Sequence, residues 1–159
     1  MPLVQVELAV TAGSGTEFEV VCIRPGPANG LQYPPAVLAA STPLWDGVTS
    51  FADHADALDR TRAGGRSVRD VCGVIAQPTW DETRGITATL RLTGRAGEEL
   101  SPLLSGLVHD RDAGLPVPNV GLSADLLITH SQNVVVQIDR VLSVDVVFNP
   151  AAGGRLERV

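Results

Sequence analysis

The segment Pro118-Asn119-Val120-Gly121-Leu122-Ser123-Ala124-Asp125 leads into the apolar run Leu126-Leu127-Ile128. A polar turn, His130-Ser131-Gln132-Asn133, follows, and a second apolar run extends over 134–138. Apolar runs of this length that are bounded by turn residues are typical of β-strands. The pattern therefore predicts two strands, and the first of them carries a serine near its beginning.

Further strands are predicted outward from this pair, because apolar and polar residues alternate with a period of two. The clearest is 85–92, and a strand over 67–77 contains Gly73, which indicates a bulge or a close backbone approach. The other expected strands are 3–10 and 18–23, which form a hairpin, the short segment 48–51, and the long apolar stretch 134–148. Helical spacing of leucines predicts a helix over 98–112, and a shorter helix is expected at 34–40. Residues 55–65 are predicted to be a loop, and 78–84 a turn.

These elements define the expected fold class. Six to eight strands and two helices that do not alternate along the chain favour a β-rich α+β fold over a parallel α/β sheet. We expect a closed or nearly closed β-barrel with flanking helices. The 159 residues predict one domain over 1–159, whose core is built from Val, Leu, Ile and Ala because aromatic residues make up only 4%.

The charge of the chain argues against a nucleic-acid partner. The net charge is -6, and all twelve basic residues are arginines. The densest basic stretch holds Arg60, Arg62, Arg66 and Arg69, and three aspartates lie close to it. We interpret this stretch as a solvated polar loop, since an acidic chain without a basic patch does not attract phosphates.

Cys22 and Cys72 are flanked by apolar residues and are not in a C-x-x-C motif, so we expect buried free thiols in a reducing compartment. No apolar window reaches about 18 residues, so the sequence predicts neither a membrane span nor a signal peptide but a soluble, intracellular protein. Three scattered histidines and the absence of a glycine-rich phosphate loop imply no metal and no cofactor.

Three residues could form a nucleophilic site. A serine hydroxyl becomes a strong nucleophile when an imidazole accepts its proton and a third group orients that imidazole. Ser123 follows Gly121 in a strand, and His54 lies just past another predicted strand. Asp145 interrupts the apolar stretch Val144–Phe148, so its carboxylate must face solvent or meet a partner. Each residue also has an ordinary interpretation: a serine at a strand start, an exposed loop histidine and a solvated aspartate.

Five short motifs occur together in a characteristic order. They are Phe51-Ala52-Asp53-His54, Gly73-Val74-Ile75, Gly85-Ile86-Thr87-Ala88, Val120-Gly121-Leu122-Ser123-Ala124-Asp125, and Val141-Leu142-Ser143-Val144-Asp145-Val146-Val147 followed by Pro150-Ala151-Ala152-Gly153-Gly154. From about residue 34 to residue 154, this set resembles the prohead (capsid maturation) serine proteases of tailed bacteriophages. The resemblance implies the fold of the herpesvirus assemblins, a β-barrel of about seven strands wrapped by helices.

The resemblance also assigns roles to residues. It implies that Ser123 is the nucleophile and His54 the general base. The third member is an acid in the phage enzymes, which Asp145 matches, and a second histidine in the assemblins, for which His109 is the fallback. The implied protein is a serine endopeptidase of the assembling prohead in the host cytoplasm. Its substrates would be phage scaffold and major capsid protein, and it could cleave itself.

Other interpretations stay open. The same barrel could be a non-catalytic capsid-assembly module, or the chain could be an unrelated small β-barrel binding domain. The helix at 98–112 could form the interface of a homodimer or higher oligomer. Packing of its apolar side on the barrel is the simpler explanation. Relatives often continue into a scaffold-like tail that this chain, ending at Val159, lacks, so the resemblance allows a truncated or a self-processed form.

Overall fold

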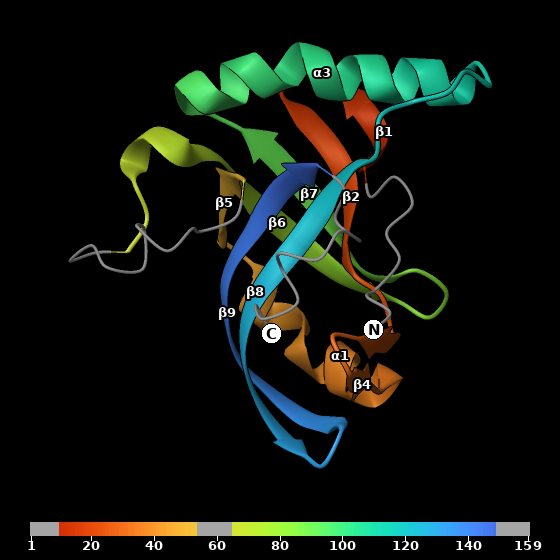
Figure 1. The fold of residues 1–159 in the computed structure, drawn as a ribbon, viewed down its shortest axis with the longest axis vertical. Coiled ribbons are helices and arrows are strands. Elements are labelled where there is room, and N and C mark those ends of the chain that lie inside the picture. The colour runs from red at the N-terminus through yellow and green to blue at the C-terminus, as the bar shows by residue number, and fades with distance from the viewer. Residues whose placement is uncertain (1–9, 54–64, 149–159) are drawn as a thin grey trace.

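Nine strands form one strongly curled sheet (Figure 1) in the computed structural model, which describes residues 10–53 and 65–148. The strands are β1 (Val10–Ser14), β2 (Glu17–Ile23), β3 (Gly26–Ala28), β4 (Leu31–Tyr33), β5 (Thr49–Ala52), β6 (Val71–Asp81), β7 (Gly85–Leu92), β8 (Val120–Ser131) and β9 (Val134–Phe148). Their order is β1-β2-β7-β6-β5-β9-β4-β3, and β8 pairs with the other edge of β9. Because β8 also contacts β2, the sheet curls into a half-barrel.

The predicted fold class is confirmed. Seven strands are longer than three residues, which agrees with the expected number of about seven. Strands β1 and β2 form an antiparallel hairpin, although β1 (Val10–Ser14) begins where the first strand of the predicted hairpin was expected to end; β7 has the predicted bounds. The close backbone approach predicted at Gly73 is also present, because a Cβ atom there would lie 2.5 Å from the carbonyl oxygen of Arg91. The predicted strand 3–10, except Val10, and the predicted loop 55–65, except Gly65, lie outside the described residues.

Two α-helices and two 3₁₀-helices accompany the sheet in the described part of the chain: α1 (Pro35–Ser41), η1 (Thr42–Trp45), η2 (Val68–Asp70) and α3 (Gly94–Asp112). Helix α3 lies across one end of the half-barrel (Figure 1) and packs on β1, β6 and β7. It begins four residues before the predicted helix. The pattern missed this first turn because few apolar residues lie in it, so it has no helical periodicity. Gly97 in that turn allows a close approach, since a Cβ atom would lie 2.6 Å from the carbonyl oxygen of Cys72.

The turn predicted at 78–84 was wrong for most of its length. Strand β6 continues to Asp81, and only three residues separate it from β7. The β6–β7 register shifts between Ala76 and Thr79, and Gln77 has a φ of 54°. This irregularity accommodates Pro78, because proline lacks the N–H that a regular ladder requires and is found at bulges. The Pro78 signal therefore marked a bulge rather than the end of the strand.

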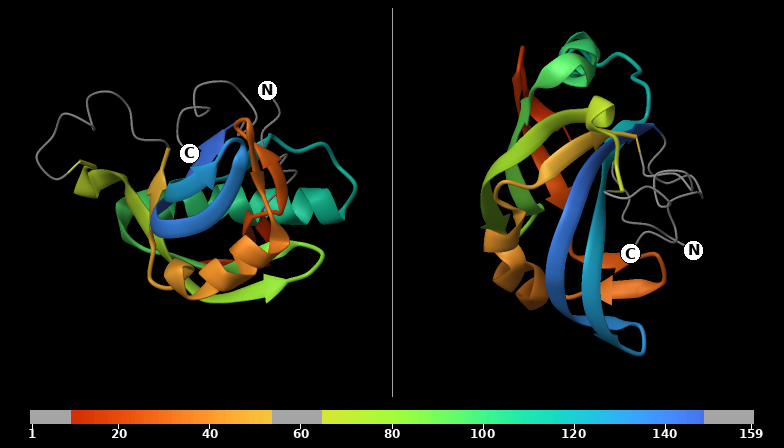
Figure 2. Two further views of the ribbon diagram at one scale, coloured as in Figure 1. Left: turned by 90° about the horizontal axis from the view of Figure 1, so that it is seen from below. Right: turned by 90° about the vertical axis from the view of Figure 1, so that its left-hand side faces the viewer.

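Strand β9 has the predicted bounds, 134–148, but buried and exposed residues do not alternate along its first half. The β8–β9 register shifts at three places and leaves Val136, Asp139 and Leu142 of β9 without a partner position on β8. Between 135 and 144, every third residue of β9 is therefore buried. Repeated bulges increase local twist and bend the strand that carries them. The β8–β9 hairpin accordingly forms a long, curved arm that extends past the rest of the sheet (Figure 2).

The core lies inside the curl of the sheet and is built mainly from aliphatic side chains, as predicted. Leu38, Ile75, Leu90 and Val144 are completely buried. Trp45 is also completely buried, and its indole N–H donates a hydrogen bond of 3.0 Å to Ser41 Oγ. Strands β5, β9 and β8 enclose this core on one side, and the same three strands carry the candidate site.

Candidate active site

One row of residues crosses three neighbouring strands. Ser123 of β8 is the register partner of Asp145 of β9, and Asp145 is in turn the register partner of Phe51 of β5. Directly paired residues project their side chains to the same face of a sheet, and Cβ atoms of such pairs lie about 4.5–5.5 Å apart. The structure thus brings Ser123 and Asp145, which are far apart in the sequence, onto one face beside each other.

The two residues differ in exposure. Asp145 is completely buried, whereas Ser123 is only half-buried and can be reached from solvent. The next pair on the same face, two positions along the strands, has the reverse order, with Asp125 on β8 opposite Ser143 on β9. Ser143 is 3% exposed, and its Oγ has no hydrogen-bond partner among the described residues. Of the two serines on this face, only Ser123 is accessible to a substrate.

Arg66 lies against the Asp145 carboxylate. Its Nη1 is 3.4 Å from each carboxylate oxygen of Asp145, and its guanidinium lies 4.1 Å from the centroid of the Phe51 ring. Only 14% of the Arg66 side chain is exposed. The interpretation of this arginine as part of a solvated loop was therefore wrong, because a buried carboxylate and an aromatic face replace its water. The apolar setting of Asp145, for which we expected either solvent or a partner, was the signal for this pair.

The end of β5 is fixed beside the same row. The N–H of Asp53 donates to the carbonyl oxygen of Val146 at 2.8 Å, and Arg66 Nη2 donates to the carbonyl oxygen of Asp53 at 2.8 Å. Asp53 has a φ of 73°, a left-handed conformation that is uncommon for residues other than glycine and occurs at functional sites. His54 follows Asp53 directly in the sequence and lies outside the described residues.

The other two histidines are not part of this row. His109 is on α3, its side chain is 82% exposed, and its Nδ1 lies 3.2 Å from the Asp110 carboxylate. His130 is exposed in the β8–β9 turn region, where its Nδ1 is 2.8 Å from the carbonyl oxygen of Gln132. Helix α3 packs on β1, β6 and β7 rather than on the strands that carry Ser123 and Asp145.

Both cysteines are buried free thiols, as predicted. Burial raises the pKa of Cys22 to about 12. Burial also raises the pKa of Cys72 to about 12, with a further rise from the negative charge of Asp145 that Arg66 partly opposes. A thiol with such a pKa stays protonated near neutral pH, so neither cysteine is a nucleophile. Its response to both charges places Cys72 close to the Arg66–Asp145 pair.

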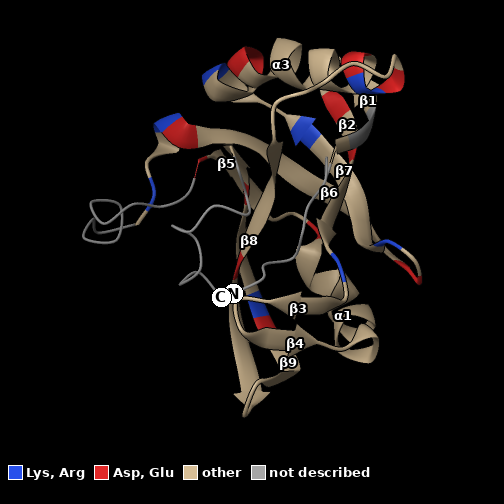
Figure 3. Cartoon of the chain, turned by 45° about the vertical axis from the view of Figure 1, so that its right-hand side comes forward, with Lys and Arg blue, Asp and Glu red and all other residues tan. Residues whose placement is uncertain are grey.

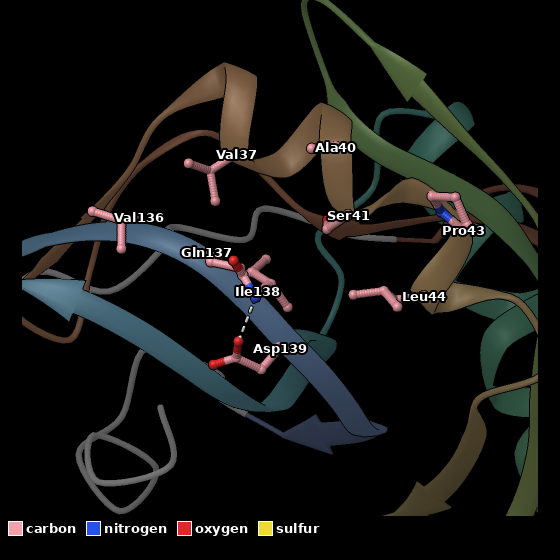
Figure 4. Close-up of a pocket in the computed structure, with 9 residues that line it drawn as sticks. All are labelled: Val37, Ala40, Ser41, Pro43, Leu44, Val136, Gln137, Ile138 and Asp139. Carbon is pink, nitrogen blue, oxygen red and sulfur yellow. Dashed lines mark hydrogen bonds between the residues drawn. The ribbon is translucent and has the colours of Figure 1, made fainter.

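A groove lies elsewhere, between α1, η1 and β9, and has a volume of about 450 Å³ (Figure 4). Its polar groups are already engaged. Ser41 Oγ donates to the carbonyl oxygen of Leu38, and Gln137 Nε2 donates to Asp139 Oδ1 at 2.6 Å. The remaining lining residues are apolar: Val37, Ala40, Pro43, Leu44, Val136 and Ile138. This groove has no activated nucleophile.

Charged residues of the described segments are mixed in sign. Figure 3 shows acidic and basic residues next to one another on α3. Within residues 10–53 and 65–148, no group of three His, Cys, Asp or Glu side chains could hold a metal ion. None of the described helices is long and apolar enough to cross a membrane.

Similarity to known proteins is found in structure and not in sequence. No protein-family model matches the chain, and no curated protein matches its sequence. Among solved structures, the chain is similar to the capsid assembly protease of bacteriophage T4, with a TM-score of 0.48 and 15% sequence identity, over 91% of this chain and 90% of that one. A likeness at this level carries no argument about activity, which must be derived from the site itself.

Proposed function

We propose that this protein is a serine endopeptidase of the prohead maturation type, with Ser123 as nucleophile, His54 as general base and Asp145 as the acidic third member. The observation that carries the proposal is the cross-strand pair of an accessible Ser123 and a completely buried Asp145. The order of the sequence motifs around Asp53-His54, Ser123 and Asp145 supports the same assignment.

The proposed chemistry is acyl transfer. His54 accepts the proton of Ser123 Oγ as that oxygen attacks the carbonyl carbon of the scissile peptide bond. The imidazolium then gives the proton to the leaving amine, and an acyl-enzyme remains on Ser123. Water, activated by His54 in the same way, releases the acyl group. The Asp145 carboxylate stabilises the imidazolium and keeps the ring in the tautomer that accepts the proton.

Burial suits Asp145 for this role. A carboxylate without exposed surface interacts more strongly with a nearby cation than a solvated one does, because water does not screen it. Partial exposure suits Ser123, since a peptide must reach its hydroxyl. The fixed backbone of Asp53 supports the placement of the residue that follows it, because hydrogen bonds to Val146 and Arg66 hold both sides of Asp53.

The proposed substrates are scaffold protein and the N-terminal segment of the major capsid protein of a tailed phage. These substrates follow from the resemblance of the sequence motifs to the prohead proteases. The same resemblance supports cleavage of the chain by itself. The proposal places the reaction inside an assembling prohead, where cleavage of scaffold precedes maturation of the shell. The proteolytic activity and the role in capsid assembly predict different results, so each can be tested separately.

The direct test is labelling with a fluorophosphonate probe, which forms a covalent bond with an activated serine. We expect the wild-type protein to be labelled at Ser123 and Ser123→Ala to be unlabelled. Ser143→Ala is the matched control, because it removes a hydroxyl from the same face two positions along the strand and should keep full labelling. Equal labelling of Ser123→Ala and wild type would show that another residue is the nucleophile. Cleavage of co-expressed scaffold and capsid proteins tests the substrates.

A second function is favoured by one observation. Arg66 pairs with Asp145, so the buried carboxylate has a structural explanation without catalysis. A non-catalytic capsid-assembly module on the same half-barrel would use the pair only to hold β5 against β9. In that case Ser123→Ala would leave head maturation intact, and the wild-type protein would resist the probe.

A further inference from the structure

We propose that Arg66 is a positioning residue of this site: it holds the Asp145 carboxylate and the Asp53 carbonyl in one fixed arrangement. The inference rests on the proposed protease function, in which Asp145 is the acidic member and the residue after Asp53 is the base. Arg66 itself is not placed on the substrate or on the reacting atoms.

The first argument is the geometry of the guanidinium. Nη1 contacts both oxygens of Asp145 at 3.4 Å, while Nη2 donates to the Asp53 carbonyl at 2.8 Å. A guanidinium is planar, so the positions of these two nitrogens are fixed relative to each other. Contact with one partner therefore determines the position of the other. A lysine ammonium would supply the charge without this fixed fork.

The second argument is what holds Arg66 itself. Its guanidinium lies 4.1 Å from the centroid of the Phe51 ring, and Phe51 is the register partner of Asp145 on β5. Ring and carboxylate thus come from adjacent positions on neighbouring strands, and the arginine rests on both. With 14% of the side chain exposed, few other rotamers are available to it.

The third argument is the peptide that Arg66 holds. The Asp53 carbonyl belongs to the peptide bond that joins Asp53 to the proposed base. The strained φ of 73° at Asp53 needs support from its surroundings, and the hydrogen bonds to Val146 and Arg66 provide it. Arg66 consequently links the backbone next to the base with the carboxylate that would orient the base. Misplacing such groups by about 1 Å can lower a rate on the order of 100-fold.

The test compares Arg66→Gln and Arg66→Lys with Arg69→Gln, which removes an exposed arginine three residues along. The first readout is the rate of fluorophosphonate labelling of Ser123 per folded molecule. We expect wild-type rates for Arg69→Gln and rates lower by roughly 10- to 100-fold for both Arg66 variants. If Arg66→Gln does not fold, Arg66→Lys decides. A wild-type rate in a folded Arg66 variant would overturn the inference.

A second readout does not depend on activity. Hydrogen exchange of the Asp53 amide reports whether its bond to Val146 stays formed. We expect Arg66→Gln, or Arg66→Lys if the former is unfolded, to exchange this amide at least about tenfold faster than Arg69→Gln does. Equal exchange rates in the Arg66 variant and in Arg69→Gln would overturn the inference that Arg66 holds Asp53 in place. Absence of labelling in the wild-type protein would instead refute the proposed function, and exchange would still decide whether Arg66 fixes Asp53.

Discussion

The energetic coupling of Arg66 and Asp145 can be measured with a double-mutant cycle. Its variants are Arg66→Gln, Asp145→Asn and the double substitution, which replace each charged side chain by a neutral polar one. Asp145 is completely buried and the Arg66 side chain is 14% exposed, so each single variant leaves a charge that has lost this ion pair in a place that water hardly reaches. The double variant leaves neither charge. We therefore expect it to be much more stable than the sum of the two single changes implies.

The magnitude follows from distance and burial. At 3.4 Å and an effective dielectric constant of about 20, Coulomb's law gives an attraction of about 5 kcal/mol. Removing one partner of a buried pair typically costs about 3–5 kcal/mol. A separation of 3.4 Å is long for a charge-assisted hydrogen bond, which favours the lower half of that range. We expect about 4 kcal/mol for Arg66→Gln, about 3 kcal/mol for Asp145→Asn, and a coupling energy of about 2–3 kcal/mol.

The assay is equilibrium unfolding in urea for all four proteins, with the slope checked for two-state behaviour. Arg91 and Glu17 form the control cycle, because their N–O distance is also 3.4 Å while their side chains are 59% and 60% exposed. That pair should show a coupling below about 1 kcal/mol. If the Arg66–Asp145 coupling is no larger than that of the control, burial does not strengthen the pair and the reasoning is refuted.

Three further predictions concern other parts of the half-barrel. Gly73→Ala should lower the free energy of unfolding by about 1–3 kcal/mol because its Cβ would meet a carbonyl oxygen, whereas Gly106→Ala, in open space on α3, should raise it by about 0.5–1 kcal/mol; similar values for both would contradict the close approach. A colorimetric thiol reagent at pH 8 should leave the folded protein unmodified and react with Cys22 and Cys72 only after unfolding, since their pKa values are raised to about 12; fast reaction of the native protein would refute this. Asp81→Ala should lower the urea midpoint at pH 7. Two backbone N–H groups that donate to the Asp81 carboxylate hold its pKa below the usual value of an aspartate, so its stabilisation is present above that usual pKa and is lost as the pH falls through the lowered pKa; a difference from wild type that does not shrink on acidification would contradict the assignment.

The strands could be predicted from sequence where the pattern is local. The bounds of β7 were predicted because apolar and polar residues alternate there without interruption. The bulges of β9 could not be, since whether Val136, Asp139 and Leu142 have partner positions depends on the β8–β9 register, and register is a property of two strands. Pro78 was misread for the same reason, because a bulge and a turn share the same local signal.

The candidate site was predictable only in part. An aspartate in an apolar run must either face solvent or have a partner, and this directed attention to Asp145. The identity of that partner could not be read, because Arg66 stands in a stretch whose composition is that of an ordinary polar loop. Likewise, the sequence contains both Ser123 and Ser143 near aspartates. Only the fold shows that Ser143 is buried and that Ser123 is within reach.

The bulges of β9 also affect the exposed edge of the sheet. Among the described strands, β4 pairs with β9 at Val134 and β5 pairs with it at 144–146, which leaves the intervening edge of β9 without a neighbouring strand. A straight, exposed edge of that length would be a template for pairing with another chain and for aggregation. Extra residues at Val136, Asp139 and Leu142 interrupt its row of N–H and C=O groups, and Asp139 adds a charge. The distortion that bends the β8–β9 arm therefore also protects its open edge, and deleting a bulge residue should make the protein more prone to form fibrils.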